Sequence, residues 1–215
     1  MSLQRENQPT SCNSAAPGPS EFTPEERVIL LKLAHESILS ALEHREMSLI
    51  PPSPHFSEPR GAFTTLYFQG QLRGCVGYVL PISSLYGTVA ETARAAAFED
   101  TRFPPVTLQE AASLEVSLSI LSPLKIIRPE EVEIGVHGLV VAQGGRRGLL
   151  LPQVPVEHHW VRRTFIEQTC QKAGLPLDAW QKGATLEAFT AEVFGDREIS
   201  TAESRNAIGG PLPNQ

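Results

Sequence analysis

The stretch AFTTLYFQGQLRGCVGYV, residues 62–79, contains two runs of strand-forming residues separated by a short turn. The first run, 62–68, is rich in Thr and aromatic residues, and the second, 72–79, carries Val, Leu and Tyr. Such residues favour the pleated, half-buried surface of a sheet. Gln69-Gly70-Gln71 between them is a turn signal, because glycine adopts the backbone angles that tight turns need. The stretch therefore predicts an antiparallel β-hairpin.

The residues before and after this hairpin favour helices. Thr23-Pro24-Glu25-Glu26 forms a capping box with proline at the first helical position, and apolar spacing predicts a helix to about Glu46. The four prolines within residues 51–59 predict a loop, and residues 83–98 predict an Ala-rich helix with one apolar face. Thr107-Leu108-Gln109-Glu110 predicts the start of a short helix.

The second half of the chain supplies further strands and one helix. Residues 114–121 alternate between apolar and polar side chains, which predicts a strand with one polar face. Residues 138–143 and 147–151 flank Gly144-Gly145 and predict a second hairpin. A helix over 156–173 and a single strand over 185–194 complete the order. This order predicts an α+β fold with a mixed or antiparallel sheet and helices on one side.

Length and charge limit the classes of protein. The chain has 215 residues and a formal net charge of −6, which argues against nucleic acid as a partner. No membrane span or secretory signal is visible, and three widely spaced cysteines favour reduced thiols in the cytoplasm. We expect a disordered tail over residues 1–21, one domain over 22–197 and a flexible tail over 198–215.

The segment Leu72-Arg73-Gly74-Cys75-Val76-Gly77 is the first candidate for chemistry. Because side chains on a strand alternate, Arg73 and Cys75 are expected on one face, where the guanidinium would stabilise a reactive thiolate. Gly74 and Gly77 would open the backbone to a substrate. The alternative from spacing alone is a buried structural cysteine, with the arginine paired elsewhere.

A second candidate is the charged segment after the Ala-rich helix. Glu99 or Asp100 could act as a general base, and Arg102 could bind a carboxylate or phosphate group of a substrate. The alternative is that Asp100 caps the turn and pairs with Arg102. The residues alone leave both interpretations open.

Histidines provide further candidates. His137 precedes a predicted strand, and His159 belongs to a His pair expected in the first turn of a helix. Each could move protons or contact a substrate. A zinc site from His137, His159, Cys75 and Cys170 would lack any closely spaced ligand pair, so we expect no metal. The residues identify no cofactor.

Several motifs resemble the AMMECR family, which is named for a human chromosomal region linked to Alport syndrome and elliptocytosis. The motifs are LRGCVG (72–77), FEDTRFPP (98–105) and GVHGL (135–139). Two more, RGLLLPQV (147–154) and TCQKAGLP (169–176), are similar to its prokaryotic branch, often called AmmeMemoRadiSam system protein A. The resemblance covers residues 24–195, nearly the whole of the expected domain.

The resemblance implies an α+β fold with a larger and a smaller lobe and a groove between them. It also implies a suspected active site at Arg73, Gly74, Cys75 and Gly77. Prokaryotic members are often encoded beside a Memo-like protein and a radical SAM enzyme, which implies these two as partners. The family's reaction is not implied by its motifs.

Two hypotheses of function follow. In the first, the chain is an enzyme in which the Cys75 thiolate acts on a small organic substrate and Arg102 holds an anionic group. Glu99, Asp100 or a histidine would then move protons, with His137 among the catalytic residues and His159 on the substrate. In the second, the chain is a non-catalytic adaptor that binds a partner or ligand in the same groove.

Overall fold

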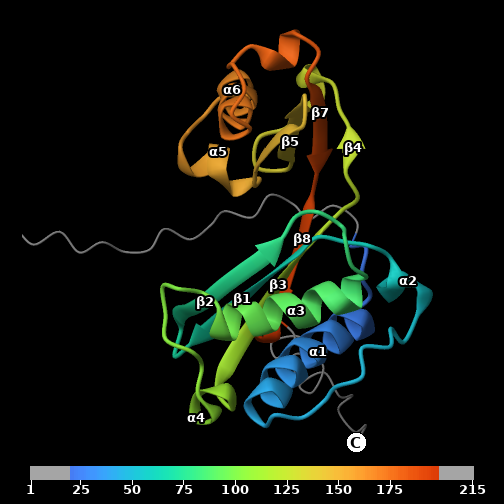
Figure 1. Cartoon of the computed structure of the whole chain (residues 1–215), viewed down its shortest axis with the longest axis vertical. Helices are drawn as coiled ribbons and strands as arrows, with labels where there is room; N and C mark the ends of the chain where they lie inside the picture. The colour runs from blue at the N-terminus through green and yellow to red at the C-terminus, as the bar shows by residue number, and fades with distance from the viewer. Residues whose placement is uncertain (1–19, 199–215) are drawn as a thin grey trace, which may run out of the picture.

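The structure is a computed structural model that describes residues 20–198, and it has two lobes, each built on a four-stranded antiparallel sheet (Figure 1). The larger sheet has, in spatial order, β2 (Gln71–Tyr78), β1 (Ala62–Phe68), β3 (Leu114–Leu121) and β8 (Ala191–Gly195). The smaller sheet has, in spatial order, β4 (Lys125–Ile126), β7 (Thr185–Phe189), β5 (Gly138–Gln143) and β6 (Arg146–Leu150). The predicted α+β class is confirmed, although two sheets replace the one we expected.

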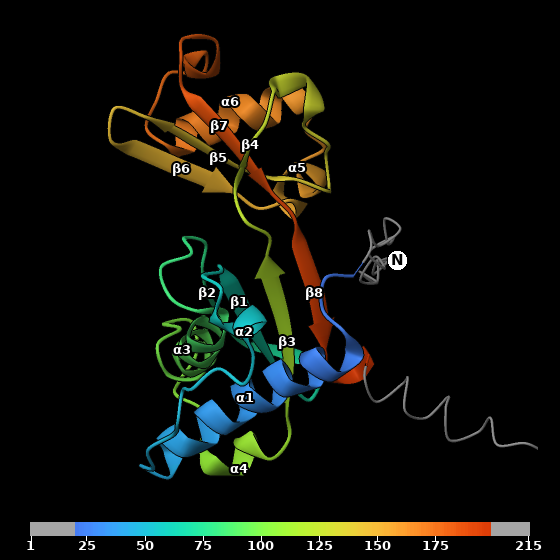
Figure 2. The same cartoon turned by 90° about the vertical axis from the view of Figure 1, so that its right-hand side faces the viewer.

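Helices cover one face of the larger sheet (Figures 1 and 2). The helices of this lobe are α1 (Pro24–Leu42), α2 (Pro54–Ser57), α3 (Leu85–Phe98) and α4 (Leu108–Ala111). The smaller lobe contains α5 (Gln153–Glu157), α6 (Arg162–Lys172) and two single 3₁₀ turns, η1 (Pro129–Glu131) and η2 (Ala179–Gln181). None of the helices in residues 20–198 combines the length and apolar character needed to cross a membrane.

The predicted starts of α1 and α4 are confirmed, whereas the end of α1, the loop over 51–59 and the single helix over 156–173 were predicted wrongly. Thr23 and Glu26 form the capping box of α1, whose helix ends at Leu42 rather than near residue 46. The Pro-rich passage, expected as a loop, contains the four residues of α2. The single helix expected over 156–173 is instead α5 and α6, separated near His159, whose φ of 53° lies outside helical backbone.

The prediction of a single strand over 185–194 is also wrong. The strand is interrupted at Thr190, and the chain passes there from one sheet to the other. β7 belongs to the smaller sheet and β8 to the larger one. The N–H of Ser122 bonds the carbonyl of Thr190 at 2.9 Å, and the N–H of Thr190 bonds Ser122 Oγ at 3.0 Å. The two connections between the lobes therefore lie side by side, as Figure 2 also shows. An alternating pattern cannot reveal such a crossing, since both strands have the same period.

Apolar side chains fill each lobe and the junction between them. The main core lies between the larger sheet and its helices, and its members include Leu30, Ile38, Leu66, Val89 and Leu118. The core of the smaller lobe includes Leu139, Val141, Phe165 and Ile166. A third cluster joins the lobes and includes Phe63, Leu121, Val140, Leu149 and Phe189. At this point side chains pack between the lobes where we expected a groove.

The tails expected over residues 1–21 and 198–215 lie outside the described residues, except at their inner ends. Ser20 and Glu21, which we assigned to the first tail, are described and both bond Glu192 of β8. The domain therefore extends at least to Ser20.

Candidate functional site

Cys75 lies in the middle of β2, the edge strand of the larger sheet. The hairpin register puts it opposite Thr65 of β1, and Thr65 Oγ1 donates a hydrogen bond to Cys75 Sγ at 3.3 Å. The residue as a whole is half-buried, and its sulfur has a hydroxyl partner. A hydroxyl donor stabilises a thiolate, which is the reactive form of cysteine.

The side chain of Asp100 bonds the backbone of β2 at Cys75. Its Oδ2 accepts a hydrogen bond from the backbone N–H of Cys75 at 2.8 Å. Arg102 donates to the same carboxylate through Nε at 2.9 Å and through Nη2 at 2.7 Å. These bonds, that of Arg102 foremost, hold the pKa of Asp100 well below its usual range. A carboxylate whose oxygens are occupied in this way is suited to positioning Cys75 rather than to accepting a proton.

Of the two interpretations left open for the charged segment, the structure shows the pairing of Asp100 with Arg102. Arg102 also stands over the ring of Phe103, with its guanidinium carbon 5.4 Å from the centroid. The pKa of Arg102 is raised, chiefly by Asp100 and to a smaller degree by the charge of Cys75. Because its side chain is 55% exposed, Arg102 is a cation beside the thiol that an incoming anion can reach.

Arg73 does not share a face with Cys75 as we expected. The ladder between β1 and β2 shifts register at Leu66 and Tyr67, which pair with Gly74 and Leu72, so Arg73 sits in a bulge. A bulge interrupts the alternation of side chains, and the expectation relied on that alternation.

The side chain of Arg73 turns instead to α4 and is buried there. Its Nε and Nη2 bond the two carboxylate oxygens of Glu110 at 2.9 and 3.2 Å, and Nη2 also bonds the carbonyl of Pro105 at 3.3 Å. The hydrogen bond from Arg73 lowers the pKa of Glu110 to about 2. Arg73 therefore joins β2 to α4 through its ion pair with Glu110. This agrees with the alternative stated above, in which the arginine is paired away from the cysteine.

The two glycines beside Cys75 serve close packing. A Cβ at Gly74 would lie 2.1 Å from the carbonyl oxygen of Ala96 on α3, and one at Gly77 would lie 2.2 Å from the ring of Phe63. We expected both glycines to contact a substrate. The structure gives each of them a neighbour that leaves no room for a side chain, and their contact with a substrate stays a prediction.

The remaining proton-transfer candidates come from three other segments of the chain. Glu99 ends α3 with an exposed side chain, and His159 is exposed between α5 and α6. His137 belongs to the smaller lobe, where its Nδ1 accepts the N–H of Glu133 at 3.0 Å. Within residues 20–198, no hydrogen bond or ion pair connects any of these three with Cys75.

Metal-binding side chains are not gathered at Cys75. Cys170 is buried in the smaller lobe, where burial raises the pKa of its thiol, and the possible zinc set is not brought together within the described part of the chain. Glu21, His55 and Glu58 do have ligand atoms within 4.8 Å of one another. However, Arg60 already bonds both carboxylates, which makes this trio part of an ion-pair network.

Thr65 is a site residue that we did not predict from the sequence. The turn pairs Phe68 with Gln71 and Tyr67 with Leu72, and this register would place Thr65 opposite Gly74. The bulge at Arg73 shifts the pairing by one residue and brings Cys75 opposite Thr65, so the turn alone does not reveal this contact. The class of protein is thus an α+β protein with two antiparallel sheets and one distinctive cysteine. This cysteine lies on an edge strand, where a hydroxyl bonds its sulfur and an arginine-bound carboxylate bonds its backbone.

Comparison with known proteins shows the family. The sequence model of the AMMECR1 family matches residues 31–194, and the chain therefore belongs to the AMMECR1 family. A protein of Methanosarcina acetivorans is 46% identical over 151 residues, covering 67% of this chain and 76% of the relative. Protein MK0488 of Methanopyrus kandleri is 40% identical over 190 residues, covering 83% of this chain and 92% of its own.

A solved structure is similar as well. The crystal structure of the uncharacterized protein PH0010 from Pyrococcus horikoshii has a TM-score of 0.63 and 38% sequence identity to this chain. The match covers 78% of this chain and 89% of that one. The fold and the family are thus shared with relatives from archaea, and the names of these three relatives state no reaction.

Proposed function

We propose that this AMMECR1 protein is a thiol-dependent enzyme in which Cys75 acts on a small organic substrate with an anionic group. The observation that carries the proposal is the set of hydrogen bonds around the half-buried residue Cys75. Thr65 donates to its sulfur at 3.3 Å, Asp100 accepts its backbone N–H at 2.8 Å, and Arg102 pairs with that same carboxylate at 2.7 Å. Together these contacts fix the position of the sulfur and give it a hydrogen-bond donor.

The steps at this site are simple. Arg102, exposed over Phe103, binds the anionic group and aligns the substrate. The thiol of Cys75 releases its proton to solvent, and the sulfur lone pair forms a bond to the carbon of a polarised double bond in the substrate. The π electron pair of that double bond moves to its other atom, which takes up a proton from solvent. Thr65 donates to the sulfur before the attack, and Asp100 keeps the strand in place.

The family resemblance adds a cellular setting to the proposal. The motifs at residues 147–154 and 169–176 support membership of the AmmeMemoRadiSam branch, as its protein A. In that setting the chain would work in the cytoplasm with a Memo-like protein and a radical SAM protein as partners. Co-purification of these two proteins with the tagged chain from its own host tests this setting.

Alkylation by iodoacetamide tests the reactive thiol. Mass spectrometry follows the rate at Cys75, Cys170 and Cys12 across a range of pH, with Cys12 as the internal reference. We expect Cys75 to react faster than Cys12 below neutral pH, and a Cys75→Ser variant to keep its fold. Equal or slower reaction of Cys75 at every pH would contradict the proposal.

A second candidate is a non-catalytic adaptor that binds partner proteins through the same edge of the larger sheet. One observation favours it: among residues 20–198, no side chain that commonly accepts protons bonds Cys75 Sγ. The alkylation experiment separates the two candidates, because an adaptor needs no activated thiol. If Cys75 reacts like Cys12 and a partner still binds the Cys75→Ser variant, the adaptor is the better description.

A further inference from the structure

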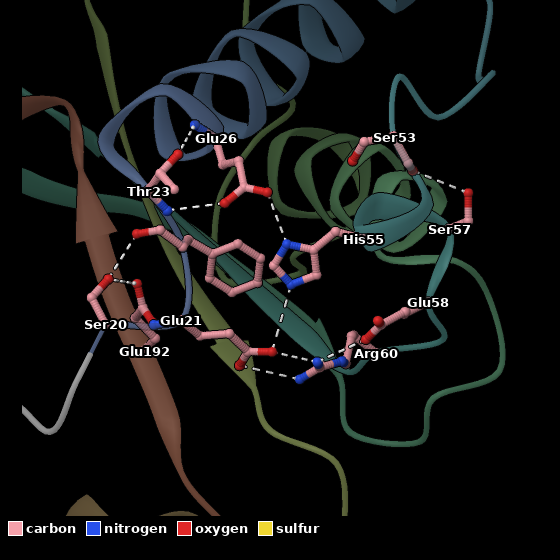
Figure 3. A network of polar contacts seen from close by, with 11 residues as sticks. Ser20, Glu21, Thr23, Glu26, Ser53, His55, Ser57, Glu58, Arg60 and Glu192 are labelled. Atoms are coloured by element: carbon pink, nitrogen blue, oxygen red, sulfur yellow. Dashed lines mark hydrogen bonds and ion pairs between the residues drawn. The ribbon is translucent and has the colours of Figure 1, made fainter.

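The residues just before α1, 20–23, form a strap that runs from the side of β8 to the start of α1 (Figure 3). Phe22 anchors the strap and is only 2% exposed. Its ring stacks on His55 with centroids 4.8 Å apart and planes 8° from parallel, and it also contacts Phe194 of β8. The strap is thus held in part by a residue that can titrate near neutral pH.

Polar contacts tie the strap to β8 through one carboxylate. Glu192 accepts from Ser20 Oγ at 3.1 Å and from the backbone N–H of Glu21 at 2.7 Å. Arg27 of α1 completes this group, since it pairs with Glu192 at 2.8 Å and donates to Ser20 Oγ at 2.7 Å. The strap therefore lies directly on the strand that returns from the smaller lobe.

A second group of charges surrounds His55. Its Nδ1 lies 2.8 Å from Glu26 Oε1 of α1, and its Nε2 lies 3.6 Å from Glu21 Oε1 of the strap. Arg60, which is 5% exposed, bonds Glu21, pairs with Glu58 at 2.9 Å and reaches the carbonyl of Leu121 at the end of β3. This group joins the strap to the other connecting strand.

Protonation of His55 brings the charges around it closer to balance, from a net −2 to a net −1. Three carboxylates lie around it, from Glu21 on the strap, Glu26 on α1 and Glu58 after α2. Among the described residues Arg60 pairs with Glu21 and Glu58, whereas the ion pair of Glu26 is with His55 itself. A neutral imidazole leaves these carboxylates with less compensation and ends its ion pair with Glu26.

We propose that the strap is a proton-controlled latch, held on β8 and on the end of β3 while His55 is protonated and loosened when His55 loses its proton. The same geometry favours the latch over a metal site, since Arg60 and His55 already occupy the carboxylates. The device lies at the lobe junction, and it is independent of the chemistry proposed for Cys75.

The direction of the pH dependence follows from linkage. The hydrogen bond to Glu26 raises the pKa of His55 above its ordinary value, while burial opposes the rise. A group whose folded pKa is raised contributes stability below its unfolded pKa, about 6.5, and loses it as the pH rises through the folded value. The pKa values of Glu26 and Glu58 are lowered, chiefly by His55 and Arg60 respectively, so both carboxylates stay charged in this window.

Amide hydrogen exchange on the full chain tests the latch. The N–H groups of Glu21 and Thr23 are bonded to Glu192 and Glu26, so their protection reports closure of the strap. We compare about pH 6 with about pH 8.5, after correction for the intrinsic rate of exchange. Protection should fall by about tenfold for each unit by which the pKa of His55 is raised. Equal protection at both pH values would overturn the proposal.

Two variants and one titration complete the experiment. His55→Gln should remove the pH dependence of strap protection, and persistence of the dependence in this variant would overturn the latch. His35→Gln is the matched control, because His35 of α1 also bonds a carboxylate, Asp196, at 2.8 Å. It should keep the dependence. An NMR titration of the His55 ring in the unaltered protein avoids any folding defect, and a pKa below about 6.5 would refute the proposal.

Discussion

The backbone N–H of Cys75 donates to the carboxylate of Asp100 across 2.8 Å, and this bond joins the edge strand β2 to the turn after α3. An edge strand normally presents open N–H groups to solvent. Here one of them is closed by a carboxylate that Arg102 keeps ionised. The thiol of Cys75 is therefore held in position by its own main chain as well as by Thr65.

The hydroxyl of Thr65 should control the reactivity of Cys75. Thr65→Val keeps the branched shape on β1 and removes the donor to Cys75 Sγ, so alkylation should slow by about fivefold, the worth of one hydrogen bond. Thr64→Val is the matched control, because the neighbouring Thr64 bonds buried Thr92 instead. It should cost about 1 kcal/mol of stability and leave the alkylation rate unchanged. Equal alkylation rates in the two variants would rule out this role of Thr65.

Arg102 and Arg73 should differ in their effects. Removing the cation beside the thiol, in Arg102→Ala, should slow alkylation of Cys75 with little loss of stability, because Arg102 is exposed. Arg73→Ala breaks the buried pair with Glu110 and should cost about 3 kcal/mol, with no direct effect on the thiol. Chemical denaturation and iodoacetamide kinetics measure the two effects. If Arg73→Ala stays folded and slows alkylation of Cys75 while Arg102→Ala does not, then Arg73 and not Arg102 influences the thiol.

The pair of Arg73 and Glu110 predicts a loss of stability in acid. The pKa of Glu110 is lowered from 4.5 to about 2, chiefly by Arg73. A lowered pKa contributes stability above the unfolded value, and this stability is lost as the pH falls through the folded value. Glu110→Gln should therefore be less stable than the unaltered chain near neutral pH, by on the order of 2 kcal/mol, and the difference should shrink between about pH 4.5 and 2. A difference that is independent of pH would contradict this assignment.

Gly74 should tolerate no side chain. Gly74→Ala would bring a methyl group within 2.1 Å of the Ala96 carbonyl oxygen and force β2 away from α3, at a cost of about 2 kcal/mol or more. Thermal denaturation measures this cost. Gly87→Ala on α3 is the control, since its added methyl group would meet no atom closer than Ser84 Oγ at 3.2 Å. Equal melting temperatures for the two variants would show that the contact at Gly74 can relax.

Local signals in the sequence predicted most of the elements correctly. The turn around Gly70, the capping box at Thr23 and the alternation of residues 114–121 each involve neighbours along the chain. Such short-range preferences act before any tertiary contact forms, so they can be read without a structure. The candidate cysteine was also identified in this way, together with the charged segment that contains Asp100 and Arg102.

The amino-acid sequence was sufficient for the α+β class, both hairpins, and the segments that contain Cys75, Asp100 and Arg102. The tertiary structure was needed to show that Arg73 turns to Glu110, that the strand over 185–194 crosses between two sheets, and that His55 meets the strap. The reason is physical. A bulge, a change of sheet and an ion-pair network depend on contacts between residues far apart in the chain, and local propensity carries no record of those contacts.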